Sequence, residues 1–368
     1  MESSNFIVAL LITFFVSLVF TLGVIWVAKR LKVMDYPNRA RKIHKKAIPL
    51  LGGLAIFFGF NLVVLFYLLY SDGLTGDTII MRNIVGIMVG TLFLIVGGVL
   101  DDKYDLKPKH QIVWPILAVF SVIIGGIGID WITNPFGEGL IYLNEPSVTL
   151  FWYSGFPYQI TILADLFTFI WLMGMIYTTK VLDGLDGLVS GVTIIGGIFI
   201  FLTALNKSEI IQYDVALLAM ILIGAFAGFL VFNFNPAQIF LGEGGSTLAG
   251  FLLGSLSIVS GSKIGVTLML LSIPVLDFLW TIIRRIMERK SSVAIADRKH
   301  LHHRLLDAGM SVKKAVLTLY GVTVVFGVIV YYLQDFGLSF TGLAMFSLIV
   351  FMLILAYVYK STKERKRA

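Results

Sequence analysis

The 368-residue chain has a composition that excludes a water-soluble globular protein. Apolar residues make up 58% of it and charged residues 14%, whereas soluble domains average about 45–50% and about 25%. The absence of cysteine excludes disulfides and thiolate chemistry. A net charge of +7 can attract nucleic acid or anionic lipid, so the placement of the basic residues must decide between these partners.

Eleven apolar stretches are each long enough, or nearly so, to cross about 30 Å of hydrocarbon at about 1.5 Å per residue. They predict an all-α polytopic fold with transmembrane helices near residues 6–28, 50–70, 83–100, 112–129, 160–180, 188–205, 213–232, 244–259, 264–284, 315–333 and 339–359. The stretch 244–259 is short, and fusing it with the next one would reverse the orientation of everything after it. The first stretch lacks a preceding basic region, so we expect it to be retained. We expect one integral membrane domain over residues 1–368.

The basic residues predict the orientation of the chain, because Lys and Arg are retained on the cytoplasmic side of a membrane. With the N-terminus outside and the C-terminus in the cytoplasm, all of the 29 Lys and Arg except Arg82, Lys207 and Lys263 fall in or beside cytoplasmic loops. All five histidines fall there as well. Membrane topology therefore explains the net charge, and we expect the lipid bilayer and no nucleic acid as a partner.

The largest external segment spans residues 130–159 and is interrupted by several Pro and Gly residues. Apolar residues alternate in part over 140–152, on both sides of Asn144-Glu-Pro146, which suggests a small β-hairpin. A structural cap and a plain surface loop both fit this segment, and neither predicts chemistry.

Carboxylates follow the third and the fifth predicted spans. Asp101 and Asp102 are about 100° apart on a helix, so one is suited to orient or deprotonate a substrate while the other holds position. Asp183 and Asp186, in Asp-Gly-Leu-Asp-Gly, lie on one face if the helix continues. Charged groups are costly at a membrane and indicate function. So many carboxylates on one face require a compensating cation, and Mg²⁺, which prefers oxygen ligands and substrate phosphates, is the natural candidate.

The loop after the seventh predicted span contains no Lys or Arg. It carries Asn233, Phe240 and Glu243 ahead of a Gly-Gly-Ser helix start, which suits recognition of a nucleobase and a metal-bound phosphate. Taken alone, Phe240 is more often a packing residue than a stacking platform.

The cytoplasmic loop over residues 285–314 is rich in histidine and arginine. Within five residues it contains His300, His302, His303 and Arg304. Zinc competes with phosphate as the ligand of such a run, but cysteine is absent and the neighbouring Arg298 and Lys299 repel a cation. The basic side chains suit a pyrophosphate well.

The first predicted cytoplasmic loop adds a second basic stretch, most of which we interpret as a topology signal and as lipid-headgroup contact. His44, Lys45 and Lys46 lie nearest to the Pro-Leu-Leu-Gly-Gly helix start that follows. They are the members of this stretch that can reach a phosphate.

The order of these motifs resembles that of the polyprenyl-phosphate N-acetylhexosamine-1-phosphate transferases from end to end. The segment His300-Leu-His-His-Arg304 is similar to the N-acetylglucosamine-1-phosphate branch, which starts wall teichoic acid or O-antigen chains, whereas the muramoyl-pentapeptide branch carries three consecutive histidines and an acid. The resemblance implies that UDP-GlcNAc and undecaprenyl phosphate give undecaprenyl-diphospho-GlcNAc and UMP. It implies Mg²⁺ as the cofactor, with Mn²⁺ as a substitute. It also implies an active site on the cytoplasmic face of the bacterial cytoplasmic membrane. A homodimer is an expectation from the family. Phospho-N-acetylmuramoyl-pentapeptide transfer, or another UDP-N-acetylhexosamine donor, is the alternative.

The resemblance also assigns roles to the motif residues. The expected catalytic carboxylates are Asp101, Asp102, Asp183 and Asp186, and the expected metal ligands are Glu243 and Asp183. The expected substrate contacts are Asn233 and Phe240 for uridine, and His300, His302, His303 and Arg304 for the pyrophosphate or the sugar.

The chain departs from the family pattern at three positions. Glu243 stands where the metal ligand is usually Asp, and Leu50 stands where Arg is common. Lys180 replaces a common Asn before Asp183, where it can pair with an acid or contact a substrate phosphate.

A transporter or lipid flippase that uses intramembrane acids is the alternative from a different class. Most acids gather on one membrane face instead of forming a chain through the midplane, which favours the enzyme. Asp277 is the main exception, and Asp165 lies near the outer end of its span.

Overall fold

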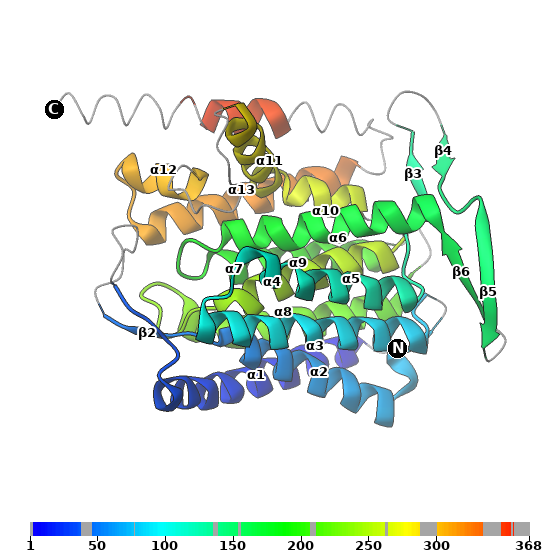
Figure 1. Cartoon of the computed structure of the whole chain (residues 1–368), viewed down its shortest axis with the longest axis horizontal. Coiled ribbons are helices and arrows are strands. Elements are labelled where there is room, and N and C mark those ends of the chain that lie inside the picture. The colour runs from blue at the N-terminus through cyan, green and yellow to red at the C-terminus, as the bar shows by residue number, and fades with distance from the viewer. Residues whose placement is uncertain are drawn as a thin grey trace.

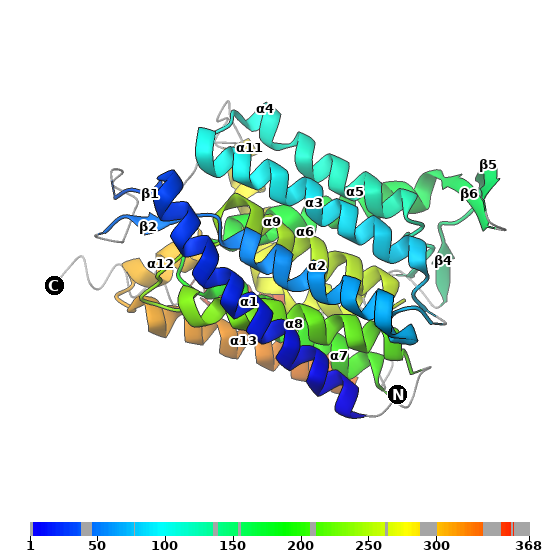
Figure 2. The same ribbon diagram turned by 90° about the horizontal axis from the view of Figure 1, so that it is seen from below.

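Long helices form nearly the whole of the computed structural model, which describes residues 3–37, 46–76, 78–134, 139–153, 156–206, 211–261, 264–287, 300–333, 347–354 and 356. They lie side by side along the long axis of the molecule (Figures 1 and 2). The helices are α1 (Ser3–Leu31), α2 (Gly52–Tyr70), α3 (Met81–Tyr104), α4 (Pro108–Gln111), α5 (Val113–Ile124), α6 (Ile162–Leu182), α7 (Leu188–Ala204), α8 (Tyr213–Asn233), α9 (Gly242–Val259), α10 (Ile264–Leu270), α11 (Ser272–Met287), α12 (Leu301–Asp307) and α13 (Val312–Leu333).

Six helices in the described part of the chain are long and apolar enough to cross a membrane. They are Asn5–Leu31, Gly52–Tyr70, Met81–Tyr104, Ile162–Leu182, Tyr213–Asn233 and Val312–Tyr332. A helical, multi-pass membrane protein is thereby confirmed, while the count of eleven spans and the orientation stay predictions. Of the last expected span, 339–359, the described residues 347–354 and 356 are helical.

The structure divides the stretch 264–284 into α10 and α11, while its crossing of the membrane as a single span stays a prediction. Pro274 explains the break, since a proline has no backbone N–H to donate to the carbonyl one turn earlier and its ring clashes with that carbonyl. The helical bonds on either side persist, from Leu271 N to Thr267 O at 3.0 Å and from Val275 N to Leu271 O at 2.9 Å. By contrast, the expected separation of 244–259 from this segment is confirmed, because α9 ends at Val259.

The segment 130–159 forms β-strands, but the hairpin expected around Asn144-Glu-Pro146 is wrong. The strands are β3 (Trp131–Thr133), β4 (Leu140–Tyr142), β5 (Ser147–Tyr153) and β6 (Phe156–Thr161). Antiparallel pairs join β3 to β4 and β5 to β6. The buried Leu143 explains the first pair, since its backbone N–H donates to Asp130 O at 2.7 Å and holds β4 against the preceding segment. The hairpins lie together at one end of the bundle (Figure 1).

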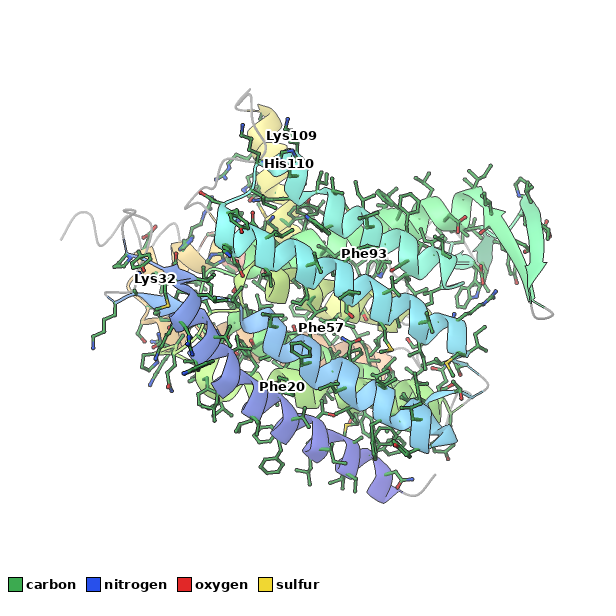
Figure 3. The ribbon with its side chains drawn as sticks, turned by 60° about the horizontal axis from the view of Figure 1, so that its bottom comes forward. Phe20, Lys32, Phe57, Phe93, Lys109 and His110 are labelled. Atoms are coloured by element: carbon green, nitrogen blue, oxygen red, sulfur yellow. The ribbon has the colours of Figure 1, made fainter. Side chains whose placement is uncertain are left out.

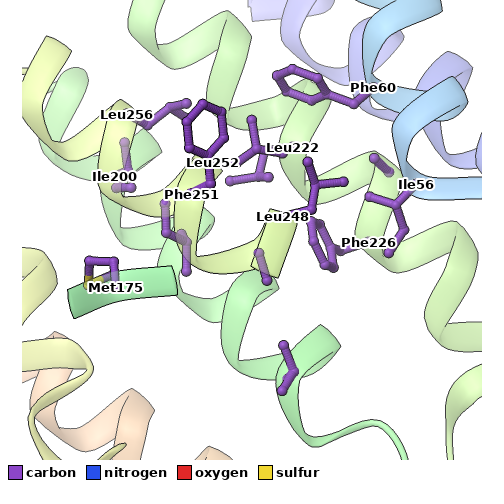
Figure 4. Close-up of a cluster of buried hydrophobic side chains, with 14 of the residues drawn as sticks. Ile56, Phe60, Met175, Ile200, Leu222, Phe226, Leu248, Phe251, Leu252 and Leu256 are labelled. Atoms are coloured by element: carbon purple, nitrogen blue, oxygen red, sulfur yellow. The ribbon is translucent and has the colours of Figure 1, made fainter. Parts of the chain in front are cut away.

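Helix α9 lies at the centre of the bundle, and nearly all of its residues are buried. Leu248, Phe251, Leu252 and Leu256 pack there within a cluster of buried apolar side chains (Figure 4). Figure 3 shows Phe20, Phe57 and Phe93 across the middle of the bundle on α1, α2 and α3, with Lys32, Lys109 and His110 toward the end away from the hairpins.

Glycines bring the first turn of α9 into backbone contact with its neighbours. A Cβ added to Gly98 of α3 would lie 2.2 Å from Gly244 Cα, and one added to Gly53 of α2 would lie 2.4 Å from Gly245 N. Small residues of this kind let membrane helices approach closely. The beginning of α9 is therefore fixed between α2 and α3.

We predict that Gly98→Val destabilises the protein by about 1–3 kcal/mol or more, because the added atoms meet backbone that cannot rotate away. Gly174→Val in α6 is the matched control, since nothing lies within 4 Å of its added Cβ. Thermal unfolding of the detergent-solubilised protein measures both effects. Equal midpoints for the two variants would contradict the close contact of α3 with α9.

Candidate active site

A cavity of about 1050 Å³ lies where the first turn of α9 meets the ends of several other helices. Its wall includes β1 (Met34–Asp35) and β2 (Ile48–Pro49), an antiparallel pair at the end opposite the hairpins (Figure 1). The acidic residues of the wall are Asp35, Asp101, Asp102, Asp105, Asp183, Asp186 and Glu243, and the basic ones are Lys29, Lys46 and His303. The motifs that the sequence separates therefore share one cavity.

The two adjacent aspartates at the end of α3 have different surroundings. Asp101 Oδ1 accepts hydrogen bonds from Leu106 N at 3.0 Å and from Gln111 Nε2 at 2.8 Å, so it fixes the turn that follows α3. Asp102 Oδ1 accepts from Glu243 N at 3.0 Å, at the beginning of α9. Asp102 thus belongs to the junction of α3 and α9, and Asp101 holds position beside it.

Asp183 and Asp186 also differ. Asp186 Oδ2 accepts from Asn235 Nδ2 at 2.7 Å and from Ala237 N at 3.1 Å, which ties the α6–α7 turn to the α8–α9 loop. Asp183 is open to the cavity, and no donor in the described part of the chain bonds to its carboxylate. Its side chain is exposed to the cavity, but the low-polarity protein around that cavity, with repulsion from Glu243 and Asp186, raises its pKa to about 7. A bound cation would therefore stabilise the ionised carboxylate of Asp183.

The α8–α9 loop is held on both sides of Phe240. Phe240 N donates to Pro49 O at 2.9 Å, and Gly52 N donates to Phe240 O at 3.0 Å. The Asn233 side chain accepts from Ser190 Oγ and donates to Ile239 O, both at 3.0 Å. Both polar groups of the Asn233 amide therefore bond to protein, and the loop presents Phe240 at the cavity wall.

Lys180, near the end of α6, contacts the acid at the start of α9. Its ammonium forms an ion pair with Glu243 and donates to Gln111 Oε1 at 3.2 Å. Gln111 in turn donates to Asp101. A continuous polar chain thus joins Glu243, Lys180, Gln111 and Asp101, and Lys180 itself is not part of the cavity wall.

The histidine segment is docked by an acid of α11. Asp277 accepts from Leu301 N at 3.0 Å and lies 3.1 Å from His300 Nδ1. His302 is buried against Gly184, whose added Cβ would lie 2.1 Å from its Nε2. Burial and the neighbouring His303 and His300 lower the pKa of His302 well below its usual value, so its imidazole is neutral.

The structure places only some of the predicted site residues at the cavity. The predicted residues in its wall are Asp101, Asp102, Asp183, Asp186, Glu243, Asn233, Phe240, Lys46 and His303. His300 and His302 are buried behind His303, so they support the wall instead of forming it. Arg304 lies in α12 outside the wall, and His44 and Lys45 lie outside the described residues.

Three residues of the site network were missed as site residues from the sequence. Gln111 ends the short helix α4 and Asn235 lies in the α8–α9 loop, and a pattern of spacing gives no indication of the partners of these single amides. Asp277 had a usable signal, since a lone carboxylate within an apolar stretch is costly and needs a partner. The buried His300 is that partner.

The donor chemistry of the cavity suits a hard divalent cation. The described residues contain no group of three or more His, Asp or Glu close enough to hold a metal by themselves. Mg²⁺ usually binds through one or two carboxylates together with waters and substrate phosphates. Asp183 and Glu243 interact electrostatically and line the same cavity, so they fit that mode.

An acid-lined cavity with basic residues at one end of a membrane helix bundle defines the class as a membrane-embedded enzyme, and comparisons identify its family. The sequence profile of the family described as glycosyl transferase family 4 matches residues 84–261. The chain is 31% identical to the probable undecaprenyl-phosphate N-acetylglucosaminyl 1-phosphate transferase of Bacillus subtilis, over 97% of this chain and 94% of the relative.

Two further relatives carry related names. The undecaprenyl-phosphate alpha-N-acetylglucosaminyl 1-phosphate transferase of Haemophilus influenzae is 28% identical, with 90% of this chain and 86% of the relative covered. The phospho-N-acetylmuramoyl-pentapeptide-transferase of Streptococcus uberis is 31% identical, with 58% and 60% covered. The chain belongs to glycosyl transferase family 4, within the polyprenyl-phosphate N-acetylhexosamine-1-phosphate transferases, which confirms the resemblance of the motifs.

We predict that Asp277→Ala releases the histidine segment. A hydrogen bond to a charged group stabilises by about 1.5–3 kcal/mol, so amide exchange over residues 300–307 should accelerate roughly tenfold or more. Hydrogen-exchange mass spectrometry measures it, and Asp307→Ala, an exposed acid of α12, is the control. Unchanged exchange in Asp277→Ala would show that this carboxylate does not dock the segment.

Proposed function

We propose that the chain transfers N-acetylglucosamine-1-phosphate from UDP-GlcNAc to undecaprenyl phosphate, giving undecaprenyl-diphospho-GlcNAc and UMP. The observation that carries the proposal is the shared cavity, whose wall combines the five motif carboxylates with His303 and Lys46. The names of the Bacillus subtilis and Haemophilus influenzae relatives support this donor and acceptor. We place the reaction on the cytoplasmic face of a bacterial membrane, as the step that starts a teichoic acid or O-antigen type polymer.

In this reaction an oxygen of the lipid phosphate forms a bond to the sugar-bearing phosphorus. The bond from that phosphorus to the uridine-bearing phosphate breaks, and UMP leaves. Phosphoryl transfer depends mainly on positioning and on neutralising charge. We assign to Asp102, at the junction of α3 and α9, the positioning or deprotonation of the lipid phosphate, while Asp101 secures the turn beside it.

The remaining wall residues supply binding. Lys46 and His303 suit the diphosphate of the nucleotide, because both reach the cavity and can carry positive charge. Phe240 offers an aromatic face to uracil from a loop that Asn233 and Asp186 hold in place. His300 and His302 position His303 from behind.

We propose Mg²⁺, replaceable by Mn²⁺, as the metal of this site, with Glu243 and Asp183 as its protein ligands. When bound, the cation neutralises the charge of phosphate oxygens. The raised pKa of Asp183 supports this placement, because it reflects a carboxylate without a compensating cation among the described residues.

A transporter would place unpaired polar groups along a path through the bundle. Outside the cavity the two buried acids of the described chain are both bonded to backbone. Asp277 docks the histidine segment, and Asp214 accepts from Thr78 N at 3.0 Å and Ile79 N at 2.7 Å. These bonds indicate structural roles and favour the enzyme.

We predict that membranes containing the protein release UMP from UDP-GlcNAc only when undecaprenyl phosphate and Mg²⁺ are both present. Chromatographic detection of UMP measures the reaction, and parallel samples contain UDP-MurNAc-pentapeptide. Release from that nucleotide alone would move the chain to the muramoyl-pentapeptide branch. No release from either nucleotide would reject the transferase proposal and favour transport.

We predict that Asp102→Asn lowers the rate of UMP release by about a hundredfold or more, as expected when a group that positions or deprotonates a reactant is lost. Asp105→Asn is the matched control, since Asp105 carries the same carboxylate and lines the same cavity just beyond the end of α3. It should retain most of the activity. A near-normal rate in a well-expressed Asp102→Asn variant would remove Asp102 from the reaction.

A further inference from the structure

Lys180 is a cation held among the acids of the site. Its ammonium contacts Glu243, and the two side chains are only 25% and 19% exposed. The ammonium also bonds to Gln111, which bonds to Asp101. It lies 5.6 Å from the centre of the Tyr177 ring, whose face attracts a cation. Three neighbours therefore fix the charge of Lys180 beside Glu243.

We propose that Lys180 is an internal counter-cation that competes with a divalent metal ion for the Glu243 carboxylate. In this arrangement Lys180 neutralises Glu243 while the metal is absent, and metal binding at Glu243 requires the ion pair to open. Lys180 is then a positioning residue that sets the metal affinity of the site, instead of a ligand of the substrate. The proposal rests on the proposed function only in taking Glu243 as a metal ligand.

Competition follows from the geometry of the pair. An ammonium and a hard divalent cation both bind carboxylate oxygens, and two positive charges at one oxygen repel strongly where water is partly excluded. With the Lys180 ammonium at Glu243 Oε1, a divalent ion binds that carboxylate less tightly than it would bind a free one. The free energy of the Lys180–Glu243 ion pair therefore opposes metal binding and lowers the measured affinity of the site for the metal.

The second bond of Lys180 extends its effect to the other side of the cavity. Through Gln111, the ammonium is linked to Asp101 at the end of α3. Glu243 is linked to the neighbouring Asp102 by its own backbone N–H. Opening the Lys180 pair thus removes one of two connections between α9 and the paired aspartates.

The test is the binding of Mn²⁺ to the purified protein in detergent, without nucleotide or lipid phosphate, followed by the electron paramagnetic resonance signal of free Mn²⁺. Lys180→Met removes the charge at similar length. We expect it to lower the dissociation constant for Mn²⁺ about tenfold, which corresponds to about 1.4 kcal/mol. Lys180→Gln, which keeps hydrogen-bonding groups, should change it in the same direction.

Lys46→Met is the matched control, because Lys46 lines the cavity and loses the same charge without touching Glu243. It should change the dissociation constant less than Lys180→Met does. In a Glu243→Gln background, the substitution of Lys180 should no longer tighten binding. Lys180→Gln is the variant to use if Lys180→Met does not fold, as judged by thermal unfolding.

An unchanged or weaker affinity for Mn²⁺ in both Lys180 variants would overturn the proposal. Equal tightening by Lys46→Met would also overturn it, because the effect would then reflect only the general charge of the cavity. Because the experiment contains no nucleotide, its result is independent of the UMP assay. A protein that releases no UMP but shows the Mn²⁺ effect would keep the ion-pair inference while rejecting the transferase reaction.

Discussion

Repulsion among carboxylates is the constraint on which the arrangement of this site depends. Seven acidic residues line one cavity, and the enclosing protein raises the pKa of Asp183 and of Glu243. The protein compensates by giving nearly every motif carboxylate its own donor. Asp101 has Gln111, Asp186 has Asn235, and Glu243 has Lys180. Asp183 receives no such donor from the described residues, and the enclosing protein together with repulsion from Glu243 and Asp186 raises its pKa to about 7.

The glycines around the cavity follow from the same constraint. Three of the donors to these carboxylates are backbone N–H groups, those of Leu106, Ala237 and Glu243, so main chain must approach within about 3 Å of a carboxylate. Gly242 has a φ of +70°, and a Cβ there would lie 2.1 Å from Asp102 Oδ2. Only a glycine satisfies both the backbone angle and the contact. The Gly-rich sequence at the start of α9 is thus a requirement of anion stabilisation as well as of helix packing.

The sequence was sufficient to predict that the acidic and histidine motifs lie at one side of the membrane. Charged residues are costly inside an apolar span, so they lie at its ends, and the order of the spans assigns each end to a side. It was insufficient for contacts between distant segments. The Lys180–Glu243 pair joins residues 63 positions apart, and its formation depends on how α6 packs against α9. Periodicity likewise places Pro274 inside one apolar stretch, whereas its missing N–H divides that stretch in the structure. The placement of His300 and His302 depended on Asp277 and Gly184, respectively, which only the fold brings to them.

Lys180 and Glu243, the two positions of the acidic site at which the motif resemblance implies a different residue, are in contact with each other. A glutamate is one methylene longer than an aspartate, so its carboxylate extends further from the backbone of α9 toward α6. A shorter side chain at 243 would leave the ammonium with Gln111 and the Tyr177 ring as its remaining partners, a poor replacement for a charge that is largely withdrawn from water. Conversely, a neutral residue at 180 would leave Glu243 among other acids without its counter-ion. Each departure is therefore costly alone, and the structure makes them one change in the charge balance of the site.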